Sequence, residues 1–229
     1  MSIPKNPETI VIRNEFYPRG LREIDIYNYY QSVKHPIVKE VLGKNLTFYF
    51  AVDLNQIVVM RKAKTPTGFL RLNYSNYDEV ITGRTISIHS NFNRTTDFGI
   101  VDIDIEDFNI AKRTTVYVYD YLIKNCNFIE DIDVKYTGKT SFHLICNLKN
   151  VMHIDNFRLI MRKFLEESEL SKIYTIERKR IPGIPNLDLS SNKYLGGYIT
   201  VNSLSVIGLK SMIVPVNEVL KFKKENARI

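Results

Sequence analysis

A short apolar run that carries two carboxylates, residues 98–104, most constrains how this chain can fold. The run Phe-Gly-Ile-Val-Asp-Ile-Asp lies between the polar segments 93–97 and 106–107, a pattern that predicts a strand. Side chains alternate along a strand, so Asp102 and Asp104 leave the same face, roughly 7 Å apart. Two like charges on a buried strand are costly unless cations neutralise them. Hard divalent cations do so, in pairs where phosphoryl groups are transferred. The alternative is an exposed strand whose polar face carries two aspartates.

The composition fits one large globular domain or two small ones. The chain has 229 residues, of which 44% are hydrophobic and 25% charged, enough to bury a core. No apolar run approaches the ~18 residues that span a membrane, and the first residues lack the apolar core of a signal peptide. These features predict an intracellular protein with no membrane partner. Cys126 and Cys146 are too few for a disulfide framework or a cysteine zinc site, so we expect no zinc and two buried thiols.

The formal net charge of +7 permits a polyanionic partner without requiring one. Part of the positive charge is concentrated in two short stretches. Such stretches either contact nucleic acid or form an ordinary solvated face, and the sequence leaves both interpretations open. The candidate nucleic-acid contacts are Arg61, Lys64, Arg178, Lys179 and Arg180.

Hydrophobic periodicity places helices and strands along the chain. Apolar residues at helical spacing predict helices over 23–42 and 111–126, a helix capped by Asp155, and a last helix over 216–222. Short apolar runs predict strands over 47–52, 56–60, 85–89, 98–105, 134–136, 142–148, 186–189, 198–201 and 212–214. Several adjacent strands in mixed order favour an α+β fold over a regular βαβ alternation. The Lys- and Glu-rich end, 221–229, is expected to be a frayed helix end or a tail.

Three features follow one another in order along the chain. After the Asp102 and Asp104 pair comes a small, basic loop that runs into a strand and places Ser141 and His143 on one face. Asp188 then lies on a short apolar strand. Two carboxylates can bridge a pair of metals whose shell a third completes, and a loop of Gly, Ser and Lys presents N–H groups and a cation to a triphosphate. A histidine and a hydroxyl at alternate positions can then hold its phosphates.

Each feature also has an ordinary structural interpretation. His143 alone is typical of a satisfied core histidine, residues 137–140 alone of a hairpin turn, and Asp188 alone of a strand-end carboxylate. A second Asp-x-Asp pattern, Asp131-Ile-Asp133, follows a polar segment and is interpreted as a loop leading into a strand. Only the ordered combination favours a phosphoryl-transfer site.

This order of motifs resembles the archaeo-eukaryotic primase superfamily, most closely the primase-polymerases similar to the polymerase domain of bacterial ligase D. The resemblance runs from about residue 10 to residue 218 and includes a helix with a double tyrosine, a glycine-led strand start, a basic segment before a proline and a strand ending in histidine. These segments are 21–30, 43–47, 60–66 and 86–89. The implied α+β fold is an RRM-like mixed or antiparallel sheet with flanking helices, over about 91–229, plus a small N-terminal α/β part, over about 1–90, within a single catalytic domain.

The resemblance implies a template-dependent nucleotidyl transferase, a DNA or RNA primase-polymerase that adds nucleotides to a 3′-hydroxyl and releases pyrophosphate. Asp102, Asp104 and Asp188 match the family's ligands for two Mg²⁺ or Mn²⁺ ions. Further positions match contacts to the incoming nucleotide or to the template: Ser141, His143, Thr137, Gly138, Lys139, His89, Lys62, Ser205 and Lys210. The implied partners are NTPs or dNTPs and a DNA or RNA template-primer, with a helicase, a ligase or an accessory subunit as further candidates.

Several positions depart from the ligase-associated relatives. Asn14 and Glu23 stand where those relatives have lysines that grip the 5′-phosphate of a broken end. Val59 and Met60 replace two phenylalanines that pack against the DNA end, and Lys210 replaces an arginine. These differences favour priming or general repair over end joining beside a ligase. End joining, and a non-catalytic nucleic-acid-binding module on the same fold, remain the alternatives.

Overall fold

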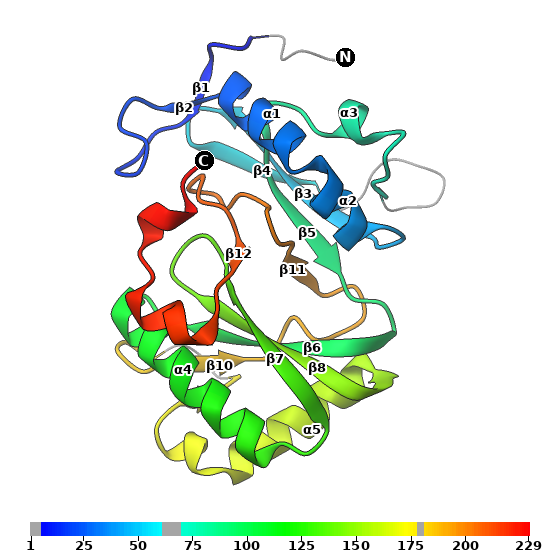
Figure 1. Cartoon of the computed structure of the whole chain (residues 1–229), viewed down its shortest axis with the longest axis vertical. Helices are drawn as coiled ribbons and strands as arrows, with labels where there is room; N and C mark the ends of the chain where they lie inside the picture. Colours follow the sequence, from blue (N-terminus) through cyan, green and yellow to red (C-terminus); the bar gives the residue numbers. More distant parts are fainter. Residues whose placement is uncertain (1–5, 61–69, 178–180) are drawn as a thin grey trace. The chain divides into compact units, whose positions relative to one another are not determined.

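The computed structural model describes residues 6–60, 70–177 and 181–229, and the chain divides into two compact units (Figure 1). The first unit contains Met1–Asn91, Gly197–Ser211 and Lys224–Ile229, and the second contains Phe92–Gly196 and Met212–Lys223. Each unit therefore combines segments that are distant in the sequence. Among the helices in the described ranges, none combines the length and the apolar character needed to span a lipid bilayer.

The second unit is built on a six-stranded sheet with the order β12-β7-β8-β6-β10-β9. All neighbouring strands in it are antiparallel except β9 and β10. Its elements are β6 (Thr95–Asp104), α4 (Phe108–Asn125), β7 (Ile129–Tyr136), β8 (Phe142–His153), α5 (Ile154–Glu167), η1 (Glu169–Lys172), β9 (Thr175–Ile176), β10 (Asn186–Asp188), β12 (Met212–Ile213) and η2 (Val216–Lys221). The chain order β6-α4-β7-β8-α5-β10 and the sheet order β7-β8-β6-β10 together make the βαββαβ arrangement of RRM-like domains. The predicted α+β class and RRM-like sheet are confirmed.

Helices α4 and α5 cover one face of this sheet (Figure 1). Helix α4 begins after Asp107, whose carboxylate accepts a hydrogen bond from the backbone N of Ile110 at 2.9 Å. On α5, buried residues at helical spacing include Phe157. A Cβ at Gly99 would overlap the Phe157 ring, so glycine lets α5 pack directly on β6. Because Gly99 faces the helices, the residues at even positions from 100 to 104 leave the opposite face.

The first unit contains a four-stranded sheet with the order β11-β5-β3-β4 and a two-stranded sheet, β1-β2. Its elements are β1 (Ile10–Ile12), β2 (Leu21–Arg22), α1 (Glu23–Ser32), α2 (Lys34–Val41), β3 (Leu46–Asp53), β4 (Gln56–Met60), α3 (Tyr77–Val80), β5 (Thr85–Asn91), β11 (Gly197–Ile199) and η3 (Lys224–Ala227). Tyr30 of α1 is fully buried, and its hydroxyl donates to the carbonyl of Ile86 on β5 at 3.0 Å. This contact ties the helix to the sheet, and Tyr77 adds a bond to the Tyr30 carbonyl at 2.7 Å.

Four local predictions are wrong. The helix expected over 23–42 is divided at Val33, because the ring of Pro36 excludes the helical carbonyl four residues earlier. The cap of α5 is His153, which accepts from the backbone N of Asp155, so Asp155 lies inside the first turn. The helix expected over 216–222 is a 3₁₀ helix, η2, and a second 3₁₀ helix, η3, follows it.

The fourth concerns the end of the chain, which is not a tail. Ala227 is fully buried, its carbonyl accepts from the backbone N of Lys210 at 2.8 Å, and the backbone N of Ile229 donates to the Tyr17 hydroxyl at 3.1 Å. A polar composition concealed these contacts because most of them are made by the backbone. By contrast, the predicted burial of Cys126 and Cys146 is confirmed.

Candidate active site

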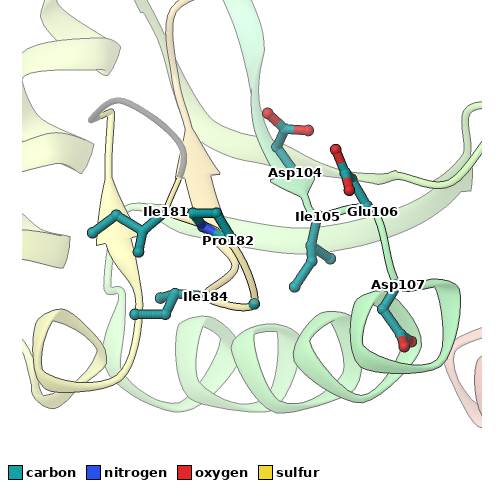
Figure 2. Close-up of a pocket in the computed structure, with 8 residues that line it drawn as sticks. Asp104, Ile105, Glu106, Asp107, Ile181, Pro182 and Ile184 are labelled. Atoms are coloured by element: carbon teal, nitrogen blue, oxygen red, sulfur yellow. The ribbon is translucent and has the colours of Figure 1, made fainter.

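Three carboxylates lie on the face of the second unit's sheet that is opposite the helices. Asp102 and Asp104 are two residues apart on β6, and Asp188 on β10 is the direct cross-strand partner of Asp102. Directly paired residues of antiparallel strands point to the same side, with Cβ atoms about 5 Å apart. Asp188 therefore lies beside the Asp102 and Asp104 pair. Figure 2 shows the Asp104 carboxylate on one side of the strand end and the Ile105 side chain on the other.

His143 joins this face from the other neighbouring strand. It pairs with Asp102 across β6 and β8, and its Nε2 lies 3.7 Å from Asp102 Oδ2. Both side chains are largely buried, at 10% and 28% exposure. Asp102 Oδ1 and His143 Nδ1 are buried and have no hydrogen-bond partner among the described residues. A polar atom that is buried without a hydrogen bond costs free energy. A ligand that bonded to these two atoms would therefore recover the free energy of the hydrogen bonds they lack.

The turn after β10 fixes the position of Asp188. Its carboxylate accepts hydrogen bonds from the backbone N and the hydroxyl of Ser190, at 2.8 and 2.9 Å. Asn192 is fully buried and continues the pairing where β10 ends: its amide accepts from Ile100 N at 2.8 Å and donates to Ile100 O at 2.6 Å. A third bond goes to Leu189 O at 3.0 Å. Asn192 thus holds the segment after Asp188 against β6.

The loop between β7 and β8 is a short hairpin closed by hydroxyl groups. The Thr137 hydroxyl lies 2.8 Å from that of Ser141, and the backbone N of Thr137 donates to the Ser141 carbonyl at 3.2 Å. Gly138 has φ +90°, a conformation that glycine adopts without strain. Lys139 is exposed, and Ser141 immediately precedes β8, two residues from His143. The loop therefore places a small-residue turn, a hydroxyl and a cation at the end of the strand that carries His143.

A pocket of about 260 Å³ opens beside Asp104 (Figure 2). Its lining combines carboxylates with an apolar wall: Asp104, Ile105, Glu106, Asp107, Ile181, Pro182, Gly183 and Ile184. The loop that forms this wall is closed by a hydrogen bond from the backbone N of Ile184 to the carbonyl of Ile181, at 3.1 Å. The carboxyl end of β6 is therefore concave next to Asp104.

The donor set fits hard divalent cations. Carboxylate oxygens are the ligands that Mg²⁺ and Mn²⁺ prefer. Asp102 Oδ1 is buried with no hydrogen-bond partner in the described part of the chain, so a cation would satisfy it. As the side chains stand, no three His, Cys, Asp or Glu groups within the described ranges are arranged to enclose a metal ion. The strand register nevertheless places the carboxylates of Asp102, Asp104 and Asp188 on one shared face.

The remaining predicted residues lie in the first unit or outside the described residues. The ring of His89 on β5 lies against that of Tyr49 in a tilted arrangement, with ring centroids 4.7 Å apart. Ser205 and Lys210 belong to a turn in which Ser205 N donates to Leu209 O at 2.8 Å. Six predicted residues lie outside the described residues: Arg61, Lys62, Lys64, Arg178, Lys179 and Arg180.

The two positions that departed from the lysines of the ligase-associated relatives have structural partners. Asn14 closes a turn, because its side-chain oxygen accepts from the backbone N of Phe16 at 2.9 Å. The buried Glu23 carboxylate is paired with Arg84 at 2.7 Å. Neither side chain offers a positive charge to a phosphate.

Sequence reasoning missed one residue of the site and misplaced another feature. Nothing in the local pattern around Asn192 sets it apart, because its hydrogen bonds to Ile100 depend on how the neighbouring segments pair. The second Asp-x-Asp pattern does not lie in a loop. Asp131 and Asp133 are within β7, at exposed positions. They alternate with buried Ile132 and Val134, the pattern of a strand that has one polar and one apolar face.

One solved structure gives an independent comparison of the fold. The "Polymerase Domain from Mycobacterium tuberculosis Ligase D in complex with DNA" superposes with a TM-score of 0.76 and covers 96% of this chain and 88% of that one. Sequence identity is 13%, so the likeness is one of fold. No protein-family profile and no curated protein sequence matches this chain.

Proposed function

We propose, from a fold shared with a DNA-bound polymerase domain, that this chain is a template-dependent nucleotidyl transferase of the primase-polymerase kind. It adds nucleotides to a 3′-hydroxyl and releases pyrophosphate, in replication priming or repair. One observation carries the proposal: Asp188, 84 residues after Asp104, is the direct cross-strand partner of Asp102. A strand with two random polar residues has no reason to pair with a third carboxylate.

Asp102, Asp104 and Asp188 would hold two Mg²⁺ or Mn²⁺ ions. Such ions neutralise the charge that develops on the phosphate and favour ionisation of the attacking hydroxyl. The carboxylates orient the site by their fixed register on β6 and β10. They also define which side of the sheet receives the substrate, because the other side is covered by α4 and α5.

The neighbouring side chains fit a triphosphate. His143 Nδ1 is buried and unsatisfied among the described residues, so it can exchange a hydrogen bond with a phosphate oxygen. Ser141 and Thr137 contribute hydroxyl groups, and the exposed Lys139 contributes a positive charge at the end of the same hairpin. His89, Ser205 and Lys210 stay predicted contacts to the incoming nucleotide, and the basic residues outside the described ranges stay predicted contacts to nucleic acid.

Primer extension by the full chain tests the proposal. Asp102→Ala, Asp104→Ala and Asp188→Ala should each abolish incorporation with Mg²⁺ or Mn²⁺, because each removes an oxygen ligand. The matched control is Asp131→Ala, which removes an aspartate from the exposed Asp-x-Asp pattern of β7 and should retain activity. Incorporation by Asp102→Ala at the wild-type level would refute the proposal.

Two further assays separate the alternatives. An end-joining polymerase would bind a recessed 5′-phosphate more tightly than a 5′-hydroxyl, whereas the Glu23 and Arg84 ion pair predicts little preference. A non-catalytic nucleic-acid-binding module would bind DNA equally with and without divalent cations and would not bind nucleotides. Primed and unprimed templates offered with rNTPs or dNTPs would then define the substrate.

A further inference from the structure

A lysine with no exposed surface lies on the same face as the carboxylates. Lys135 is on β7 and is 0% exposed. Lysine is almost never fully buried, because its ammonium group loses its hydration unless negative charge is nearby. Its chain neighbours Val134 and Tyr136 point to the face that the helices cover, with Tyr136 5.8 Å from Phe108 of α4 between ring centroids. Lys135 therefore points to the site face.

The strand register places Lys135 in line with the candidate site. It pairs with His143 on β8, which pairs with Asp102 on β6, which pairs with Asp188 on β10. The four residues form one row across four strands, all on one face. Neighbouring strands are about 4.8 Å apart, so the Lys135 and Asp102 backbones are separated by roughly 10 Å. The long lysine stem spans part of that separation.

This row has a charge balance that depends on whether a metal is present. Without a metal, Asp102, Asp104 and Asp188 repel one another, and a buried cation on the same face offsets part of that repulsion. With a divalent ion bound, the same lysine repels the ion. The other charged groups on this face of β7 are Asp131 and Asp133, which are both exposed, and Asp133 accepts a hydrogen bond from Asn147 at 3.2 Å. Their exposure leaves Lys135 as the buried charge that β7 directs toward the row.

We propose that Lys135 is a positioning residue that holds the carboxylate row in place in the absence of metal and limits how tightly the site binds a divalent cation. The inference rests on the proposed function, since it assigns the carboxylates to metal binding. It predicts that the lysine and a metal ion compete electrostatically for the same negative charge. Removing the lysine charge therefore raises the affinity for a divalent cation and lowers the stability of the metal-free protein.

Mn²⁺ binding by the full chain tests this inference without measuring activity. Calorimetric titration compares wild type with Lys135→Met, which keeps the volume and removes the charge, and with Lys135→Arg, which keeps the charge. Lys149→Met is the matched control, because it removes an exposed lysine from β8 with the same change in net charge. We expect Mn²⁺ affinity to rise about tenfold in Lys135→Met and to stay within about threefold of wild type in the other two variants. Thermal unfolding of the metal-free Lys135→Met protein should occur at a lower temperature than that of wild type.

The outcomes distinguish a failure of the role of Lys135 from a failure of the proposed function. Unchanged or weaker Mn²⁺ binding in Lys135→Met, with normal binding by wild type, overturns the role of Lys135 alone. Absence of Mn²⁺ binding by wild type, or binding unaffected by Asp102→Asn, overturns the proposed function as well. If Lys135→Met does not fold, the double variant with Asp102→Asn should fold, because the uncompensated carboxylate is gone. A double variant that also fails to fold contradicts the inference.

Discussion

Asn192→Ala should lower the free energy of unfolding of the second unit by more than is usual for the loss of a polar side chain. Asn192 is fully buried and makes three side-chain hydrogen bonds, to Ile100 N at 2.8 Å, Ile100 O at 2.6 Å and Leu189 O at 3.0 Å. Each bond contributes about 1 kcal/mol, so Asn192→Ala removes about 3 kcal/mol. Ile100 N and Ile100 O are left buried without these partners, which adds to the cost, whereas Leu189 O keeps its bond from the backbone N of residue 192 at 2.9 Å.

Urea unfolding followed by far-ultraviolet circular dichroism measures this loss. Asn147→Ala is the matched control, because Asn147 makes one exposed side-chain hydrogen bond, to Asp133 at 3.2 Å, and its loss should cost at most about 0.5 kcal/mol. Asn192→Ala should also lower nucleotide incorporation, since it releases the segment that keeps Asp188 opposite Asp102. A loss below about 1 kcal/mol, or one equal to that of the control, would show that Asn192 does not hold β10 against β6.

Three further predictions follow from local packing and charge. Gly99→Ala should lower the free energy of unfolding in urea by about 2 kcal/mol, because the new Cβ overlaps the Phe157 ring. Adding Phe157→Leu should relieve part of that loss. If the loss in the double variant equals the sum of the two single losses, the overlap is contradicted. Burial raises the pKa of the Cys126 thiol to about 11, so peptide mapping should find it unmodified by iodoacetamide at pH 8 in the folded chain and modified in urea. Arg22 holds the pKa of Asp25 below its usual value of 3.8, so the stability that this pair adds is present above that pH and is lost as pH falls through the lower folded value. The difference in unfolding free energy between wild type and Arg22→Met should therefore be constant near neutral pH and shrink below about pH 4; a difference that persists there would exclude the ion pair as its cause.

Local sequence was sufficient for most elements of the fold. Alternation and apolar runs located β6, β8 and β10, and helical spacing located α4 and α5, because these patterns directly reflect which face of an element is buried. The errors arose where backbone contacts decide the structure. Ala227 and Ile229 at the chain end are held by hydrogen bonds to distant residues, which a Lys- and Glu-rich composition does not reveal.

The candidate site was predicted only in part for a related reason. Asp102 and Asp104 share a face by strand periodicity alone, and the order of motifs along the chain added His143 and Asp188, to which the likeness to primase-polymerases then gave roles. The direct pairing of Asp188 with Asp102 depends on the register of β10 against β6, which Asn192 helps to fix. The exposed Asp131 and Asp133 pair has the same local pattern as the candidate site, so only the neighbouring strands distinguish the two.

By itself, the sequence determined the strands that carry Asp102, Asp104 and Asp188, the α+β class and the order of the motifs along the chain. Tertiary structure alone decided which of these residues are neighbours. It placed Lys135, His143, Asp102 and Asp188 in one row across four strands and left Lys135 with no exposed surface. The physical reason is that side-chain periodicity is a local property, whereas strand pairing brings together distant residues, such as Asp102 and Asp188, which are 86 positions apart, through backbone hydrogen bonds that any sequence can make.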